Sequence, residues 1–567
     1  MDNMSDWIAE CERLGKEGNT DAYCHLGEYF LDKEDYKSAK HYFQLAYSNG
    51  DGNALYSLGI ACLSSDDEKE QKEGFEYINR FAAQGDEYSF YILGFCYMNG
   101  VGVEKDVTKA VKAWENAVEF GIVDAMVDLG KYYSDTADDA NLKKAMRLYV
   151  RAEENESELG AYNIGWVYAN KLNDAQNAIK HFEKAISLGS YDAFYDIAKI
   201  YYDGQLVDKD LKKALQYFNA GAEKEDADCN FSLGIMYLNG QGVDADKQKA
   251  IDYFKKAAKL GSSSAKVNLA KCYLEGDGVK KNNKKAFELY MQAADEKAEA
   301  AYNIALLYLD GRGCDKNVEE ALKWYKIAAD KGDTDAMFDL AEIYDKGEIV
   351  NKDDALAFRY YKLAADGGDT AAMCNLGLCY INGQGCEADY QAAKEYLEKG
   401  SAAGVGMATM QLGNMYYNGV GVECDYAKGI ELYEKAAQQG CPNGYNDLAM
   451  AYCDGKYLKR DFAKARELFE KAADCGVNQA YYNLGLMYEF GHGVEKDYKR
   501  AVTLYKKAVE LGVSQALAAI MRCVKAYEDK KKNKAAHERL KARADNSGMK
   551  RKRLRTAVTT KCRTCCI

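Results

Sequence analysis

The sequence predicts an all-α solenoid of about fourteen helix–turn–helix pairs, because one pattern recurs along almost the whole chain. A small residue marks one position of this pattern, and from Ala198 onward its copies are 35 or 36 residues apart. Apolar residues around each copy have the spacing of one helix face. The 567 residues include a single proline, Pro442, as expected of a chain that is helical almost throughout. The small residues are Gly27, Gly59, Gly94, Gly130, Gly165, Ala198, Gly234, Ala270, Ala305, Ala341, Gly377, Gly413, Ala449 and Gly485.

Residues 480–512 are the clearest copy of the pattern. A first helix has Ala, Leu and Tyr on one face, a glycine-rich link follows, and a second helix has a similar apolar face. We expect Asp497 to cap the second helix, because its carboxylate can accept hydrogen bonds from the free N–H groups of the first turn. We expect Gly512 to end that helix in a left-handed conformation. Neither helix can bury its apolar face alone, so the pair is stable only in an array.

In chain order, we predict a capping helix in residues 1–20, the solenoid in residues 21–527 and a basic, disordered tail in residues 528–567. Several of the early units have short, glycine-poor links, whereas the links are regular from Gly204 onward. Pro442 stands where a first helical turn should begin, a position that tolerates proline. The Asp residues expected to act as helix caps at the ends of other links are Asp106, Asp210, Asp353 and Asp425.

The repeated pattern resembles the Sel1-like repeat, a relative of the tetratricopeptide repeat. It reads A-x-x-x-L-G-x-x-Y-x-x-G-x-G-V-x-x-D-x-x-K-A-x-x-Y-x-x-A-A-x-x-G and covers roughly residues 20–515. The resemblance implies a right-handed superhelical α-solenoid. A plain tetratricopeptide array is the alternative, although its period of about 34 residues and its shorter turn fit less well.

Charge is divided between an acidic solenoid and a basic C-terminal segment. From Arg522 to the end the chain has sixteen Lys or Arg and four Asp or Glu, a charge of +12, whereas the whole chain has a charge of −13. The residues before Arg522 therefore carry −25. Such an acidic surface repels a phosphate backbone, so we expect no nucleic acid on the solenoid, and a pentatricopeptide array is disfavoured.

Three interpretations of the tail stay open. The tail can fold back on the acidic solenoid, its MKRKRLR segment can direct nuclear import, or it can attach to anionic lipid after acylation of Cys565 or Cys566. Prenylation is disfavoured because Thr564, not a cysteine, stands fourth from the end. Cys562, Cys565 and Cys566 also make half a zinc site, but no second Cys/His pair lies nearby in the sequence.

The N-terminus and the cysteines predict a cytoplasmic protein. Residues 1–18 contain no basic-then-apolar signal region, and no run of eighteen apolar residues occurs in the chain. Eighteen cysteines without an export signal indicate reduced thiols. The basic tail leaves a membrane-peripheral or nuclear location as an alternative.

We find no motif for catalysis, for a cofactor or for a metal ion. The five histidines are scattered, and no two share a helix face. The glycine-rich links have neither the preceding strand nor the Lys-Ser/Thr pair of a phosphate-binding loop, and none has the ligand spacing of a calcium loop. The sequence therefore predicts a protein that is not an enzyme.

The candidate binding residues lie two and three positions before the recurring small residue. Most units have Asp, Asn or Gln two positions before it, and many have an aromatic ring three positions before it. In the related tetratricopeptide fold, an Asn at the matching place on the concave face often holds a bound peptide. An amide both donates and accepts hydrogen bonds, so a ladder of amides can pair with an extended chain. The residues predicted to bind peptide are Tyr162, Asn163, Asn268, Tyr302, Asn303, Asn375, Tyr482 and Asn483.

A second hypothesis is that these amides bond the neighbouring helix and set the angle between repeats. If the amides instead bind a peptide, the sequence predicts a scaffold or adaptor that binds an extended peptide segment of its protein partners. The resemblance implies the same, since Sel1-like proteins commonly assemble complexes. The alternative is an activator subunit that tethers an enzyme complex to a membrane through the basic tail. A repeat protein with its own hydrolytic activity is a third, less supported possibility.

Overall fold

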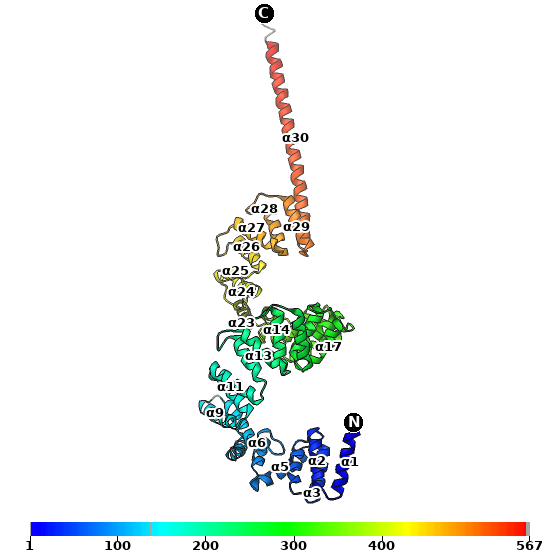
Figure 1. The fold of residues 1–567 in the computed structure, drawn as a ribbon. Helices are drawn as coiled ribbons and strands as arrows, with labels where there is room; N and C mark the ends of the chain where they lie inside the picture. Colours follow the sequence, from blue (N-terminus) through cyan, green and yellow to red (C-terminus); the bar gives the residue numbers. More distant parts are fainter. Residues whose placement is uncertain (1, 137, 563–567) are drawn as a thin grey trace. The chain divides into compact units, whose positions relative to one another are not determined.

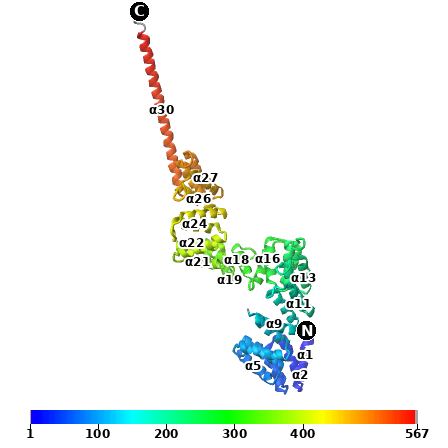
Figure 2. The same ribbon diagram turned by 90° about the vertical axis from the view of Figure 1, so that its left-hand side faces the viewer.

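The protein is all-helical, as predicted. The structure is a computed structural model that describes residues 2–136 and 138–562, and within these residues it has thirty helices and no strand (Figure 1). The chain divides into two compact units, residues 1–282 and residues 283–567. In each unit the helices follow one another in chain order (Figure 2).

The first unit contains sixteen helices in its described residues. They are α1 (Asp2–Lys16), α2 (Thr20–Asp32), α3 (Tyr36–Ser48), α4 (Ala54–Leu63), α5 (Glu68–Ala83), α6 (Glu87–Asn99), α7 (Val107–Glu119), α8 (Val123–Ser134), α9 (Asp139–Glu154), α10 (Glu158–Asn170), α11 (Ala175–Leu188), α12 (Ala193–Asp203), α13 (Leu211–Glu223), α14 (Ala227–Asn239), α15 (Lys247–Lys259) and α16 (Ser263–Glu275).

The second unit contains the other fourteen helices of the described chain. They are α17 (Asn283–Ala293), α18 (Ala298–Asp310), α19 (Val318–Asp330), α20 (Thr334–Lys346), α21 (Asp354–Asp366), α22 (Thr370–Asn382), α23 (Tyr390–Ala402), α24 (Gly406–Asn418), α25 (Tyr426–Gln438), α26 (Pro442–Asp454), α27 (Phe462–Asp474), α28 (Asn478–Phe490), α29 (Tyr498–Glu510) and α30 (Ala516–Cys562).

Each even-numbered helix from α2 to α28 contains one of the fourteen recurring small residues. The predicted number of helix pairs is therefore confirmed, with α1 before the first pair and α30 after the last. The core lies both within pairs and between successive pairs. Around α19 and α20, for example, Tyr325, Ala328, Leu340 and Tyr361 are all buried in one cluster. Burying these faces requires the neighbouring pair, which explains why the repeats occur as an array.

The small residue allows a side chain of the second helix to lie directly against the first helix. At Gly413 a Cβ atom would lie 2.9 Å from the ring of Tyr433 on α25 and 3.2 Å from the carbonyl oxygen of Gly429. At Gly485 a Cβ would likewise overlap the ring of Tyr505 on α29. The ring that fills this space therefore comes from the same pair.

Acidic residues cap the second helices, as the sequence predicts. Asp497 accepts hydrogen bonds from the backbone N–H groups of Lys499 (2.9 Å) and Arg500 (3.1 Å), at the start of α29. Gly512 follows the end of α29 with φ +92°, and Pro442 is the first residue of α26. The other four predicted caps accept equivalent hydrogen bonds from the first turns of their helices. They are Asp106, Asp210, Asp353 and Asp425.

The second glycine of a regular link lies against the preceding pair. Gly493 has φ +67°, and a Cβ there would lie 2.7 Å from the Cβ of Phe462 in the first turn of α27. Gly242 has φ +74° and makes the same contact with Leu211 on α13, also at 2.7 Å. A larger residue at this position would collide with the neighbouring helix. Glycine therefore allows the link to pack directly against the first turn of that helix.

The last helix, α30, continues past residue 527, where the sequence analysis placed the start of a disordered tail. Its described side chains from Tyr527 to Ala544 are all exposed. The domain limits at residues 20 and 527 stay predictions, and Cys565 and Cys566 lie outside the described residues. No helix in the described ranges is long and apolar enough to cross a membrane.

Candidate peptide-binding face

The even-numbered helices lie close to one another as well as to their own partners. Helix α8 contacts α10 and α12 contacts α14 in the first unit, and α24 contacts both α22 and α26 in the second. No successive odd-numbered helices pack as closely in the part of the chain that the structure describes. Elements on the inside of a curved stack approach more closely than those outside. We therefore call the side formed by the even-numbered helices the inner face.

Tyrosines of the inner face donate hydrogen bonds to carboxylates of the next repeat. The hydroxyl of Tyr162 on α10 donates to Asp196 on α12 at 2.8 Å. The hydroxyl of Tyr302 on α18 donates to Asp339 on α20 at 3.1 Å. Burial raises the pKa of both Asp196 and Asp339, and these hydrogen bonds offset only part of that effect. Two predicted binding residues, Tyr162 and Tyr302, thus join neighbouring repeats.

Two of the predicted amides bond their own helix. The Nδ2 group of Asn268 donates to the carbonyl oxygen of Ser264 at 3.0 Å, and that of Asn303 donates to the carbonyl oxygen of Glu299 at 2.8 Å. Both side chains are half-buried. One bond leaves each amide with a second N–H and its carbonyl oxygen for other partners.

Two others interact with side chains of the preceding repeat. Asn483 is buried, and its Nδ2 donates to Oδ1 of Asn446 on α26 at 2.9 Å. Asn375 on α22 interacts with the hydroxyl of Tyr361 on α21, which itself donates to Asp345 at 3.5 Å. These contacts are of the kind that the stacking hypothesis describes.

Of the two remaining predicted residues, Tyr482 makes a packing contact and Asn163 makes no hydrogen bond among the described residues. Tyr482 packs against Tyr505 with ring centroids 5.5 Å apart. Asn163 on α10 is half-buried and has no hydrogen-bond partner among the described residues. The structure thus places all eight predicted residues on the even-numbered helices, but binding of a peptide by them stays a prediction.

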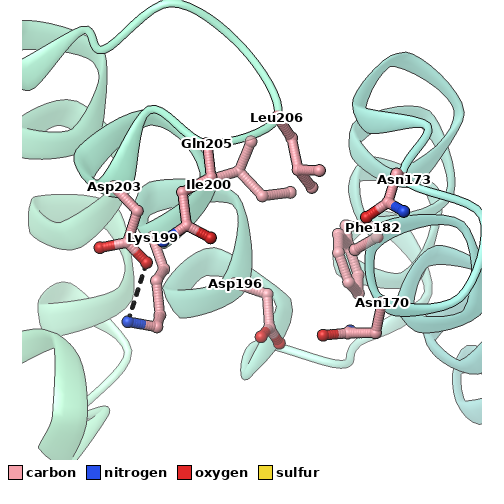
Figure 3. A pocket seen from close by; sticks show the side chains of 10 residues that line it. Asn170, Asn173, Phe182, Asp196, Lys199, Ile200, Asp203, Gln205 and Leu206 are labelled. Carbon is pink, nitrogen blue, oxygen red and sulfur yellow. Dashed lines mark ion pairs between the residues drawn. The ribbon is translucent and has the colours of Figure 1, made fainter.

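The first unit has a pocket of about 280 Å³ where α10, α11 and α12 meet (Figure 3). Its apolar lining includes Phe182, Ile200 and Leu206, and its polar lining includes Asn170 and Asp196. Figure 3 shows these side chains turned into the same space, with Asn170 and Asp196 facing each other. The pocket therefore combines apolar walls with a partly buried carboxylate.

The second unit has a similar pocket of about 230 Å³ between α18, α19 and α20. Tyr325, Ile343 and Ile349 supply its apolar lining. Asp339 and Glu348 contribute carboxylates. Asp339 lies two positions before the recurring small residue of its repeat, as Asp196 does in the first pocket.

The comparisons with known proteins identify the repeat. The family model of the Sel1 repeat matches fourteen consecutive segments that together span residues 12–513. The chain is a Sel1 repeat protein. The matched segments are residues 12–51, 52–86, 91–112, 123–157, 159–190, 192–226, 227–262, 263–297, 298–333, 334–369, 370–405, 406–441, 442–477 and 478–513.

Two solved structures and one curated relative are among the proteins to which the chain is similar. This Sel1 repeat protein is 26% identical to c5321, a protective antigen of uropathogenic Escherichia coli with an SLR fold; the match covers 79% of this chain and 97% of that one, with a TM-score of 0.50. A Sel1 repeat protein from Oxalobacter formigenes is 27% identical over 54% of this chain and 89% of its own, with a TM-score of 0.44. A putative sel1-like repeat-containing protein of Acanthamoeba polyphaga mimivirus, L21, is 26% identical over 120 residues, which is only 22% of its length.

The sequence analysis did not single out the two pockets of this Sel1 repeat protein, although the sequence contains a signal for them. The second glycine of the regular link is replaced by Leu206 in DGQLV and by Ile349 in KGEIV. In the same repeats an Asp stands where most regular repeats have an amide. Each substitution is ordinary on its own, and only the structure shows that both line one pocket.

Groups with acid–base or metal-binding potential are dispersed over the described chain. No group of three or more His, Cys, Asp or Glu side chains there is placed to hold a metal ion. His181 contacts Glu153 at 2.8 Å and stacks on Tyr168, as a packed surface histidine does. The described cysteines are free thiols.

Proposed function

We propose that this Sel1 repeat protein is a non-catalytic scaffold or adaptor that binds extended segments of other proteins on its inner face. Its repeat solenoid is a fold commonly used for protein–protein interaction. The observation that carries the proposal is the series of partly exposed amides on the even-numbered helices. Asn268, Asn303 and Asn163 keep hydrogen-bonding groups without partners among the described residues.

An extended chain has one N–H and one carbonyl oxygen at nearly every residue, and an amide side chain can bond both groups. A ladder of amides therefore gives affinity for backbone, while pockets beside it select side chains. We place the protein in a reducing compartment, the cytoplasm, because its described thiols are free.

The double variant Asn303→Ala and Asn375→Ala tests this proposal. If both amides bond a partner's backbone, each lost hydrogen bond costs about 0.5–1.5 kcal/mol, so affinity should fall roughly five- to a hundredfold. The partner is first identified by pull-down from native lysate and mass spectrometry. Affinity and thermal unfolding are then measured on the same preparation, with Asn351→Ala at an exposed link position as the control.

A folded double variant that has lost affinity supports the proposal. A double variant that melts earlier and loses affinity only in proportion supports the stacking hypothesis instead. Asn375 also interacts with Tyr361 within the protein, so melting has to be measured with particular care for this position.

A second candidate is an activator subunit that tethers an enzyme complex to an anionic membrane through α30. Its support is the charge of +12 from Arg522 onward, together with the exposed side chains of residues 527–544. Cell fractionation separates the candidates. A tethered subunit pellets with membranes at low salt and is released by high salt or hydroxylamine, whereas an adaptor of the first kind stays in the supernatant.

A further inference from the structure

The two pockets occupy the same place in two different repeats. Counted from the recurring small residues Ala198 and Ala341, six lining positions coincide, and at three of them the residues are alike: Asp196 with Asp339, Ile200 with Ile343, and Leu206 with Ile349. An aromatic ring from the preceding repeat also lines each pocket. It is Phe182 in the first pocket and Tyr325 in the second. The recurrence in both units indicates one structural cause.

That cause is the residue that replaces the second glycine of a regular link. In regular links this glycine lies against the first turn of the preceding odd-numbered helix, where a Cβ at Gly385 would overlap the backbone of Asp354. Leu206 and Ile349 stand at the equivalent position and are too large for that contact. Both side chains line a pocket instead, together with the ring of the preceding pair, Phe182 or Tyr325.

In the first pocket, two hydrogen-bond acceptors face each other and are not bonded to one another. Asp196 Oδ2 accepts from Tyr162, and its Oδ1 accepts no hydrogen bond from the described residues. The Nδ2 of Asn170 donates to the carbonyl oxygen of Trp166 at 3.0 Å, so its Oδ1 is the atom left for the pocket. Figure 3 shows this oxygen turned toward Asp196. Two facing acceptors require a donor from outside.

Lys199 does not supply that donor. Its Nζ pairs with Asp203 at 3.0 Å, one turn along α12 (Figure 3). Two carboxylates, Asp196 and Asp203, and one lysine therefore line the pocket, so its lining carries about one net negative charge, although Lys199 also acts on Asp196.

The second pocket has the same imbalance with more negative charge. Asp339 accepts from the hydroxyl groups of Tyr302 and Tyr325, both at Oδ2. Lys346 pairs with Glu342 at 2.6 Å, which again leaves a neutral pair on the helix. With three carboxylates against one lysine, the pocket lining carries about two net negative charges, although Lys346 also interacts with Asp339 and Glu348.

Burying these carboxylates in their charged form lowers the stability of the fold. Burial raises the pKa of Asp196 and Asp339, which means that the folded environment disfavours their charged form. Regular repeats avoid this cost with a neutral amide at the same position, as at Asn303. A cation in the pocket would stabilise the charged form.

A third link of this kind already contains a cation. In DGKYL the second glycine is replaced by Tyr457, and Lys456 pairs with Asp454 at 3.6 Å. The Nζ of Lys456 also lies 5.3 Å from the ring centroid of Tyr417. Tyr417 and Asp454 are equivalent in position to the pocket residues Leu309 and Lys346. A lysine of the chain itself thus contacts the positions that line the second pocket.

We propose that each of the two pockets binds the side chain of one Lys or Arg from an extended segment of a partner protein. This deepens the proposed function and rests on it, because the rest of the segment would lie along the inner face. At about 280 and 230 Å³ the pockets are below the usual size of small-molecule sites, about 300–1,000 Å³, and suit a single long side chain. The apolar walls contact its aliphatic stem, and the carboxylate and amide oxygens bind its charged end.

Peptide selection on the full chain tests the proposal. Phage-displayed random twelve-residue peptides without cysteine are selected on the immobilised protein, and single selected peptides are labelled for fluorescence anisotropy. We expect enrichment of a Lys or Arg at a fixed position. Replacing that residue by norleucine should weaken binding by about tenfold or more, as for a hydrogen bond to a charged group.

Two pairs of variants locate the binding site. Asp196→Asn with Asp339→Asn removes the charge and keeps an acceptor for the tyrosines. Leu206→Gly with Ile349→Gly puts the glycine of a regular link in place of an apolar wall residue of each pocket. Both should weaken the Lys peptides by about tenfold or more. The control is Asp192→Asn with Asp335→Asn, which removes the same charge from exposed positions near α12 and on α20. It should leave affinity unchanged.

Three results would overturn the pocket proposal alone: selected peptides without an enriched cation, Lys peptides unaffected by the pocket variants, or equal losses in the control. A chain cut after Tyr527 that binds the peptides far more tightly would assign the pockets to the chain's own basic end and overturn the partner assignment. Failure to select any specific peptide would overturn the proposed function as well. Circular dichroism on every variant shows whether it is folded.

Discussion

At the scale of single residues, the contact between the recurring small residue and the side chain beneath it limits what each repeat tolerates. Nine repeats have Gly at this position and five have Ala. Tyr433, which lies under Gly413, is held by a hydrogen bond of 2.7 Å from its hydroxyl to Asn414. The ring of Tyr433 therefore has little freedom to move away from a larger residue on α24.

Replacing Gly413 separates a tolerated change from a disruptive one. Gly413→Ala should alter the free energy of unfolding by less than about 1 kcal/mol, because the helix propensity gained by Ala offsets a small displacement of the ring. Gly413→Leu should cost about 1–3 kcal/mol or more through overpacking. Urea unfolding of both variants and the wild type measures the difference. An unchanged midpoint for the Leu variant would contradict the packing described here.

At the scale of helices, α30 is attached to the last pair through a buried carboxylate. Glu489 on α28 is only 4% exposed, and it accepts hydrogen bonds from Arg522 on α30 (2.8 Å) and from Tyr505 on α29 (2.7 Å). Burial alone would raise the pKa of Glu489, but the bonds from Arg522 and Tyr505 and the charge of Arg522 outweigh it and lower the pKa. The interaction thus joins three helices.

This attachment should weaken in acid and on loss of Arg522. A lowered pKa in the folded state means that Glu489 stabilises the fold above its ordinary pKa, and that this contribution is lost as the pH falls through the folded-state pKa. Arg522→Ala should cost about 1–3 kcal/mol, because it leaves a buried charge with one partner fewer. Hydrogen exchange of α29 and of α30 near Arg522 measures both effects. Lys525→Ala at an exposed position is the control, and equal exchange in the two variants would refute the role of Arg522.

Most of the helices could be predicted from the sequence, and most of the candidate site could not. Helix spacing, the Asp caps and the link glycines are local signals, so the pairs and their number follow from the pattern. The hydrogen-bond partners of the predicted binding amides depend on the neighbouring repeat. Asn303 bonds its own helix, whereas Asn483 bonds Asn446 in the preceding repeat. The pockets combine side chains of two successive repeats, such as Phe182 and Leu206, so no single repeat specifies them.

At the scale of the whole molecule, each pair in the array is stabilised by its neighbours, so stability should vary along the chain. The early repeats depart most from the pattern. Helix α4 has ten residues, where most even-numbered helices have thirteen, and Asn53 at its start makes no side-chain capping bond. The link between α8 and α9 has neither of the glycines of a regular link. Both pairs should open before the regular pairs from α12 onward.

A chain that ends at Gly332 tests this view, because it keeps the first nine matched repeats and removes the neighbour of α19. It should retain the helical content per residue of the full chain but unfold at a lower temperature, since the cluster around Tyr325 and Ala328 loses the side chains of α20 and α21. Circular dichroism measures both quantities. Hydrogen exchange of the full chain should show the fastest exchange in the pairs α4–α5 and α8–α9. Uniform protection from α2 to α29 would contradict nearest-neighbour stabilisation, because a single cooperative unit would then unfold as a whole.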